Sequence, residues 1–276
     1  MSTLTQTRPP TEETSAPAGG TAYLPVLEDV RPISFARLVR VELRKLVDTR
    51  SGKGVLIGIV GLTAVAMGIV LWLLRDEGAE MIALIGAAAG PQAVLLPVLG
   101  IMTAANEWGQ RTALMTFTQE PRRLRVMAAK TVAALLLGLG VLVVTLALAV
   151  GGHVLSATLA DAPVDASMTL AEVTNLTVVQ VQGVLMGVGL GALLLNVPLG
   201  IVAYFLIPVV SNLAFTSISW LREHAAWLDM GTAGQPLMGD QWLTSTQWAQ
   251  FGTTTALWVL LPLAVGLWRV ATKEVK

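Results

Sequence analysis

Long stretches without a single charged side chain constrain this sequence more than any other feature. Five of them are at least 20 residues long: 54–74, 81–106, 131–160, 173–221 and 241–268. A helix that crosses a bilayer needs about 20 such residues, because a charged side chain at the membrane centre costs about 2.5–3.5 kcal/mol. The gaps therefore predict an all-α integral membrane protein.

The fourth gap is too long for one membrane span. It holds 49 residues, and Asn196 and Pro198 near its middle predict a tight turn. We therefore expect a six-span domain over residues 32–276. The spans are expected near residues 54–74, 82–105, 131–152, 176–195, 199–219 and 248–268. Residues 1–31 lack apolar periodicity, which predicts a disordered cytoplasmic tail.

Lysine and arginine are divided unevenly between the two sides of the predicted bundle. Sixteen of the 18 lie before the first span, in the even-numbered connections or after the last span. Only Arg75 and Arg222 lie on the opposite side. Short loops rich in Lys and Arg stay in the cytoplasm. We therefore expect a multi-pass protein of the cell membrane with both termini in the cytoplasm.

The composition excludes several classes of function. Only 13% of the residues are charged and the net charge is zero, so no general attraction to nucleic acid is expected. The sequence has no cysteine, which excludes disulfides, iron–sulfur clusters and thiol catalysis. His153 and His224 are too far apart in the sequence to suggest a metal site. We expect no metal and no cofactor bound by this chain.

An amphipathic helix is predicted over residues 34–47, directly before the first span. Ser34 is a candidate N-cap after Pro32. At 100° per residue, the apolar arc contains Phe35, Leu38, Val39, Leu43, Leu46 and Val47, and the opposite basic stripe contains Arg37, Arg40 and Arg44. Such a helix is expected to lie along the cytoplasmic interface of the membrane, although a frayed segment with flanking positive charge is the alternative.

Glu42 falls inside the apolar arc of this predicted helix. A carboxylate at that position favours pairing with a basic residue of the bundle or of a partner, and snorkelling to water is the alternative.

The second cytoplasmic connection, residues 107–130, is longer than a simple tether needs to be. Its pattern predicts a short helix over 110–117 and a second helix that restarts with Pro121 in its first turn. The basic residues after it, Arg122, Arg123, Arg125 and Lys130, would surround the cytoplasmic end of the third span. Leu114, Met115 and Phe117 would form an exposed apolar knob, which favours a binding surface for a partner.

The energy source is predicted by elimination. None of the six predicted spans contains Asp, Glu, Lys or Arg, although His153 lies near the outer end of the third span. A proton-coupled carrier needs a titratable group in the membrane. No phosphate-binding loop of the form G-x-x-x-x-G-K-[ST] occurs in the sequence, so this chain is not expected to hydrolyse ATP or to be an enzyme. Energy would then arrive through a cytoplasmic contact.

Three other functions remain open on the residues alone. A membrane scaffold or accessory subunit needs no chemistry of its own. An ion-coupled secondary carrier could hold sodium with backbone carbonyls. An intramembrane protease would need a motif such as G-x-S-x-G or H-E-x-x-H, and the sequence contains neither.

The chain resembles the permease subunits of ABC exporters of the ABC-2 type. The resemblance rests on Val41-Glu42-Leu43-Arg44-Lys45-Leu46, on the Arg-Thr and Glu-Pro-Arg-Arg elements of residues 107–130, on the closing region from Trp227 to Arg269, and on the six-span plan. It implies a partnership with a separately encoded ABC ATPase subunit that binds ATP and Mg. It also implies a second permease subunit, either an identical copy or a similar chain.

The resemblance also assigns roles to particular segments. Residues 34–47 would be the interfacial connecting helix and 110–117 the coupling helix that contacts the ATPase. Glu107, Arg111, Thr112, Glu120, Arg122 and Arg123 would belong to this ATPase-coupling element, to which the pattern of the loop adds Leu114, Phe117 and Pro121.

Within the membrane, Gly183, Gly187 and Gly191 recur every four residues, which favours close helix packing within one subunit or between two. Gln180 and Gln182 are expected at the interface with water. The resemblance implies that the second and fifth spans of two subunits line the path. Asn212 and Phe215 are then the candidates for the substrate path, whose mixed lining suits an amphiphilic or apolar cargo.

The last outer loop, residues 222–246, is unusually apolar for a solvated segment. Its tryptophans favour short re-entrant or interfacial helices that act as an outer lid.

Overall fold

The computed structural model describes residues 33–274, so the predicted tail over 1–31 lies outside the described residues. Within this range the chain forms helices and no strand. Six helices are long and apolar enough to cross a membrane: α2 (Arg50–Leu73), α3 (Met81–Gly109), α5 (Arg123–Leu159), α6 (Leu170–Leu194), α7 (Val197–Ser217) and the combined segment Ser245–Thr272. The all-helical fold with six candidate spans is thus confirmed.

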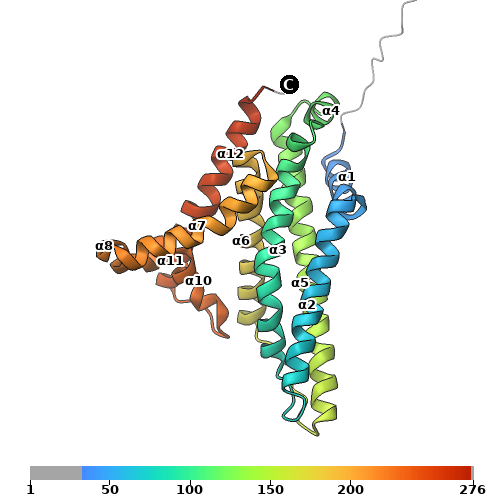
Figure 1. The fold of residues 1–276 in the computed structure, drawn as a ribbon, viewed down its shortest axis with the longest axis vertical. Helices are drawn as coiled ribbons and strands as arrows, with labels where there is room; N and C mark the ends of the chain where they lie inside the picture. Colours follow the sequence, from blue (N-terminus) through green and yellow to red (C-terminus); the bar gives the residue numbers. More distant parts are fainter. Residues whose placement is uncertain (1–32, 275–276) are drawn as a thin grey trace, which may run out of the picture. The chain divides into compact units, whose positions relative to one another are not determined.

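Helix α3 lies at the centre of the bundle (Figure 1). It packs against α2, α5, α6 and α7, and α6 in turn packs against α12 (Leu261–Thr272). Helix α1 (Phe35–Asp48) packs on α5 at the end of the bundle where α4 (Ala113–Gln119) also lies. We call this the α1–α4 end, and the end that holds the connections 74–80 and 160–169 the far end.

Several helices start or end away from the predicted positions. Helix α2 begins at Arg50 rather than at 54, because the Thr49 hydroxyl accepts a hydrogen bond from the Gly52 amide and caps it. Helix α5 spans 37 residues, or about 55 Å, and includes Lys130. The predicted turn at Asn196 is present, since its side chain caps α7 at the Leu199 amide and Leu195 adopts a left-handed conformation.

Helices α3 and α6 approach so closely that only glycine fits at their contact. A Cβ atom added to Gly187 would overlap the backbone of Pro97, and one added to Gly191 would lie 2.6 Å from the Ile101 carbonyl oxygen. At Gly183 the nearest atom, Cγ of Pro97, is at an ordinary 3.7 Å. The glycine stripe therefore packs helices within a single chain.

Pro97, one of two prolines within α3, leaves a carbonyl that another helix satisfies. Pro97 has no N–H to donate to the Ala93 carbonyl one turn earlier. The Tyr204 hydroxyl of α7 donates a hydrogen bond to that carbonyl, at 2.5 Å. This bond attaches α7 to the middle of α3.

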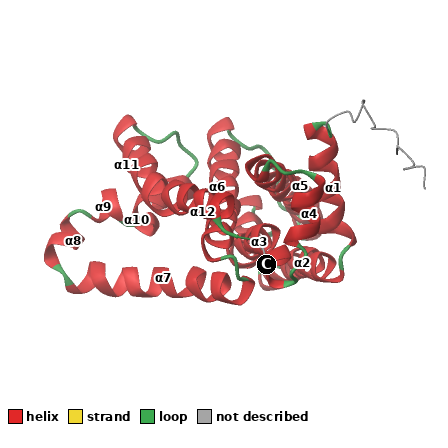
Figure 2. Ribbon diagram, turned by 90° about the horizontal axis from the view of Figure 1, so that it is seen from above, coloured by secondary structure: helices red, strands yellow, loops and turns green. Residues whose placement is uncertain are grey.

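The segment after α7 folds into short helices instead of an open loop: α8 (Ser219–Glu223), α9 (Ala225–Leu228), α10 (Met230–Gly234) and the 3₁₀ turn η1 (Gln235–Met238). They lie on the same side of the bundle as α7 and α11 (Ser245–Thr255) (Figure 2). Leu237 is buried with Leu243 and Phe251, and the Trp258 indole donates to the Leu228 carbonyl at 2.7 Å. A π-helical turn, η2 (Ala256–Leu260), joins α11 to α12 just before Pro262.

Candidate functional site: a charge network and an exposed helix

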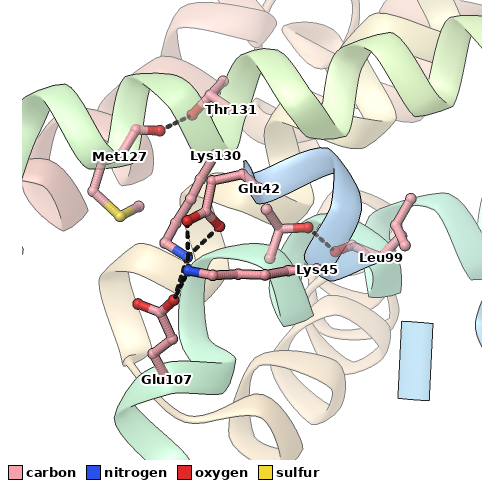
Figure 3. A network of polar contacts seen from close by, with 8 residues as sticks. Glu42, Lys45, Leu99, Glu107, Met127, Lys130 and Thr131 are labelled. Atoms are coloured by element: carbon pink, nitrogen blue, oxygen red, sulfur yellow. Dashed lines mark hydrogen bonds and ion pairs between the residues drawn. The ribbon is translucent and has the colours of Figure 1, made fainter. Parts of the chain in front are cut away.

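Four charged side chains from three helices meet at the α1–α4 end (Figure 3). The Lys130 ammonium of α5 lies 2.7 Å from Glu42 Oε2 of α1 and 2.9 Å from Glu107 Oε1 of α3. The Lys45 ammonium lies 2.7 Å from Glu42 Oε1 and 2.8 Å from the same Glu107 oxygen. Two acids and two bases thus form a closed, neutral network that joins α1, α3 and α5.

The network differs in burial from one side to the other. The Lys130 and Glu42 side chains are only 5% and 7% exposed, whereas the Lys45 side chain is 41% exposed. Burial lowers the pKa of the Lys45 ammonium, but its hydrogen bonds to Glu107 and Glu42 outweigh burial, so the pKa lies above its ordinary value of 10.5. Lys45 therefore stays charged and neutralises the carboxylates at the rim of the network.

The sequence placed Glu42 correctly inside the buried face of α1 but did not identify its partners. Lys130 was expected to be one of the basic residues around the cytoplasmic end of the third span, but its side chain is buried between helices. Glu107 was assigned to a loop, and it lies within the last turn of α3. The unusual carboxylate in an apolar arc was the only local signal for this network.

Helix α4 packs against its neighbours through an aromatic contact and a cation–π contact of Phe117. Phe117 is buried and lies 5.9 Å, centroid to centroid, from the Trp108 ring of α3. The Arg123 guanidinium lies 5.2 Å from the centroid of the Phe117 ring. It also donates to the carbonyl oxygens of Val270 (3.1 Å) and Lys273 (2.6 Å) at the end of α12. Arg123 thus fixes α4 to α12.

An ion pair outside this network closes the turn between α4 and α5. Glu120 is buried, pairs with Arg125 at 2.8 Å, and accepts a hydrogen bond from the Arg122 amide. Arg125 also donates to the Ile33 carbonyl at 2.6 Å, which ties this turn to the start of α1. The connection is therefore a packed structure and not a flexible tether.

Several residues on the outer face of this connection are exposed. Leu114 and Met115 are 52% and 66% exposed. Arg111, Thr112, Pro121 and Arg122 are exposed as well. Among residues 33–274, no hydrogen bond or ion pair to the side chains of Arg111 and Arg122 is present.

The short helix and the predicted knob need correction. Helix α4 begins at Ala113, not at 110, because α3 continues to Gly109 and Arg111 takes a left-handed conformation with φ of 56°. Phe117 is part of the core rather than of the exposed knob, since it fills the space between Trp108 and Arg123. Pro121 precedes the first turn of α5, whose N-cap is Arg122.

A groove borders the network on the α4 side. It has a volume of about 610 Å³ and lies between the α1–α2 turn, the end of α3, and α4. Lys45 and Glu107 lie along its wall, and Met115 lies on its α4 side. A side chain or helix of another protein could therefore reach both the exposed helix and the network.

The amphipathic helix forms with Ser34 as its N-cap, whose side chain accepts a hydrogen bond from the Arg37 amide. Val39, Glu42 and Leu46 are its buried residues. Phe35 and Val47 of the predicted apolar arc are 40% and 43% exposed, so the packed face is narrower than expected. Arg37, Arg40 and Arg44 are exposed, and Arg44 pairs with Asp48 at 3.1 Å.

The two candidates for the substrate path separate in the structure. Asn212 is exposed and lines a cavity with Tyr204, whereas Phe215 is half-buried and is not among the residues that line this cavity. Gln180 and Gln182 were expected at the water interface, but both are buried between helices because their amides bond the Gly138 carbonyl and the Thr255 hydroxyl.

His153 has a structural role in the described chain. Its Nδ1 lies 2.9 Å from the Ala79 carbonyl, and its Nε2 lies 3.1 Å from the Asp165 amide nitrogen. A carbonyl only accepts and an amide N–H only donates, so these contacts require the neutral ring with hydrogen on Nδ1. His153 thereby holds the two loops of the far end together.

No protein-family model matches the chain, and no curated protein matches it either. What the fold itself defines is a class: an all-helical protein with six helices that are long and apolar enough to cross a membrane.

Proposed function

We propose that the chain is the transmembrane permease subunit of an ATP-driven ABC exporter of the ABC-2 type. The observation that carries this proposal is α4, which exposes Leu114 and Met115 outward and buries Phe117 against Trp108 of α3 and Arg123 of α5. A force applied to the exposed face would pass through Phe117 and Arg123 into two candidate spans at once.

The rest of the assembly follows from this assignment. The α1–α4 end would face the cytoplasm, with α1 along the membrane interface and both termini on that side. A separate ABC ATPase subunit would bind ATP and Mg and would contact α4 through Arg111 and Arg122. A second permease subunit, identical or similar, would complete the path for an amphiphilic or apolar cargo.

The charge network would transmit the movement to α1. Lys130 of α5 pairs with Glu42 of α1 and with Glu107 of α3. Lys45, also of α1, pairs with the same two carboxylates. Because the pairs are short and largely shielded from water, α1 is expected to move together with α3 and α5. Packed elements of this kind shift between discrete arrangements rather than bending continuously.

The test is charge reversal at the exposed face of the connection. Arg111→Glu and Arg122→Glu are expected to reduce co-purification of the ATPase subunit about tenfold, or to uncouple hydrolysis from transport, because like charges replace attraction at the interface. Arg75→Glu, an equal change at the far end, serves as the control. Membrane insertion should be the same in all three variants.

Unchanged binding and unchanged coupling in both Arg111→Glu and Arg122→Glu would contradict the assignment of this face. A chain that captures no nucleotide-hydrolysing subunit at all would instead be a membrane scaffold or accessory subunit, or an ion-coupled secondary carrier.

A further inference from the structure

Two hollows adjoin each other along α6, and we call them together the cavity. The first, about 230 Å³, lies between α3, α5 and α6, and the second, about 490 Å³, lies between α6, α7 and the short helices after α7. The two hollows are neighbours, because they share the lining residues Ala93, Gln182, Met186, Tyr204 and Met230. Their size is that of a pocket for a small molecule, on the order of 300–1,000 Å³.

The lining is mostly apolar, with a few uncharged polar groups. Within the described residues no Lys or Arg lines either hollow, and the one carboxylate is Asp229. That carboxylate lies along the second hollow only, where its Oδ2 accepts hydrogen bonds from the Thr232 amide and hydroxyl at 2.8 and 2.7 Å. The first hollow therefore contains no charged side chain with which to bind an ionic ligand.

Two buried glutamines in the first hollow have unused acceptors. Gln92 and Gln180 are only 6% and 8% exposed, and both line the cavity. Gln92 donates through Nε2 to the Thr145 hydroxyl at 2.6 Å, and Gln180 donates through Nε2 to the Gly138 carbonyl at 2.9 Å. No described residue donates a hydrogen bond to the side-chain oxygen of either glutamine.

The orientation of both amides follows from their partners. The Gly138 carbonyl can only accept, so Gln180 must present its NH₂ group to it. The Thr145 hydroxyl already donates to the Val141 carbonyl at 2.8 Å, so Gln92 must also donate. The oxygen of each side chain is thus the atom free to accept a hydrogen bond from a bound molecule.

The Tyr204 hydroxyl does not supply the missing donor. Its hydrogen is used by the Ala93 carbonyl that Pro97 leaves unpaired. The first hollow therefore offers two hydrogen-bond acceptors, the side-chain oxygens of Gln92 and Gln180, in apolar surroundings. A bound molecule would have to supply the hydrogen-bond donor.

We propose that this cavity binds an uncharged amphiphile whose hydroxyl group donates its one hydrogen bond to the side-chain oxygen of Gln92 or Gln180, while its hydrocarbon part fills the apolar remainder. Its role as the site of the exported cargo rests on the proposed function, but binding itself does not need the ATPase.

The test is photolabelling of the purified full chain in lipid nanodiscs, without any ATPase subunit. The probe is a long-chain primary alcohol with a diazirine in the middle of the chain, and the matched probe is its methyl ether, which cannot donate. The alcohol is expected to label the peptides of α3 and α6 that line the cavity. The ether is expected to label them about fivefold less, the effect of one neutral hydrogen bond.

Variants locate the site independently. Of Gln92→Leu and Gln180→Leu, the variant that removes the oxygen accepting the hydrogen bond should reduce labelling about fivefold. Ala93→Leu removes no side-chain hydrogen bond and should block the cavity by its size, so it decides the question even if a glutamine variant folds poorly. Thr131→Val, which removes a hydroxyl of α5 outside the cavity, should leave labelling unchanged.

Equal labelling by alcohol and ether, or labelling that Ala93→Leu does not change, would overturn the proposal. Specific labelling of a chain that captures no ATPase would keep this site and reject the exporter assignment. Capture of the ATPase without specific labelling would keep the exporter assignment and reject this site.

Discussion

At the scale of single residues, the ion pairs of the α1–α4 end contribute very differently to stability. The pairs of Lys130 with Glu42 and Glu107 are largely shielded from water, whereas the pair of Arg44 with Asp48 has side chains that are 83% and 60% exposed. A shielded pair costs much to break, because removing one partner leaves the other charge buried and alone. An exposed pair contributes little.

Lys130→Met is expected to lower the free energy of unfolding by about 3 kcal/mol, because Glu42 and Glu107 would then share the half-exposed Lys45 alone. Arg44→Ala should change it by less than about 1 kcal/mol. Denaturation of the detergent-solubilised protein measures both. Adding Glu42→Gln to Lys130→Met should restore part of the loss, and a loss equal to that of Arg44→Ala would refute the importance of the network.

At the scale of elements, the contact between α3 and α6 determines how the bundle is assembled. Gly100 of α3 is complementary to the glycines of α6, since a Cβ atom there would lie 2.6 Å from the Val184 carbonyl oxygen. Small residues on both helices let the two backbones touch. The same contact brings Gln92 of α3 and Gln180 of α6 to the lining of one hollow.

Gly187→Ala and Gly183→Ala form a matched pair that tests this contact. At Gly187 the new methyl group would overlap the Pro97 backbone, so we expect a loss of about 1–3 kcal/mol of stability. At Gly183 the space is ordinary, so alanine should be neutral or stabilising by up to about 1 kcal/mol through its better helix propensity. Thermal denaturation in detergent distinguishes the two. Equal effects would show that α3 and α6 are not in close contact.

At the scale of the described chain, the helices α2 and α7 carry many exposed apolar side chains. Ile57, Val65, Val209 and Leu213 are each 58–71% exposed. Such surfaces are stable only against lipid or another protein, as expected for a chain that crosses a membrane. Helix α5 connects the two ends, since the α4 turn precedes it and the loop 160–169 follows it.

This arrangement predicts the sidedness of the two ends. The chain has no cysteine, so single cysteines report without background. Val164→Cys should react with a membrane-impermeant maleimide added to intact cells, whereas Thr118→Cys should react only after the cells are permeabilised. Reaction of both sites from outside would contradict a cytoplasmic α1–α4 end.

The sequence alone determined the number of candidate spans, the turn at Asn196 and the N-cap of α1, because charge-free length and capping residues act locally along the chain. Only the tertiary structure decided that Glu42 pairs with Lys130, that Phe117 is buried and that Gln180 faces a cavity. These outcomes depend on which helices touch, and residues 88 positions apart carry no local pattern that reveals their contact. A local pattern identifies a charge or an aromatic ring that needs a partner, and packing selects the partner.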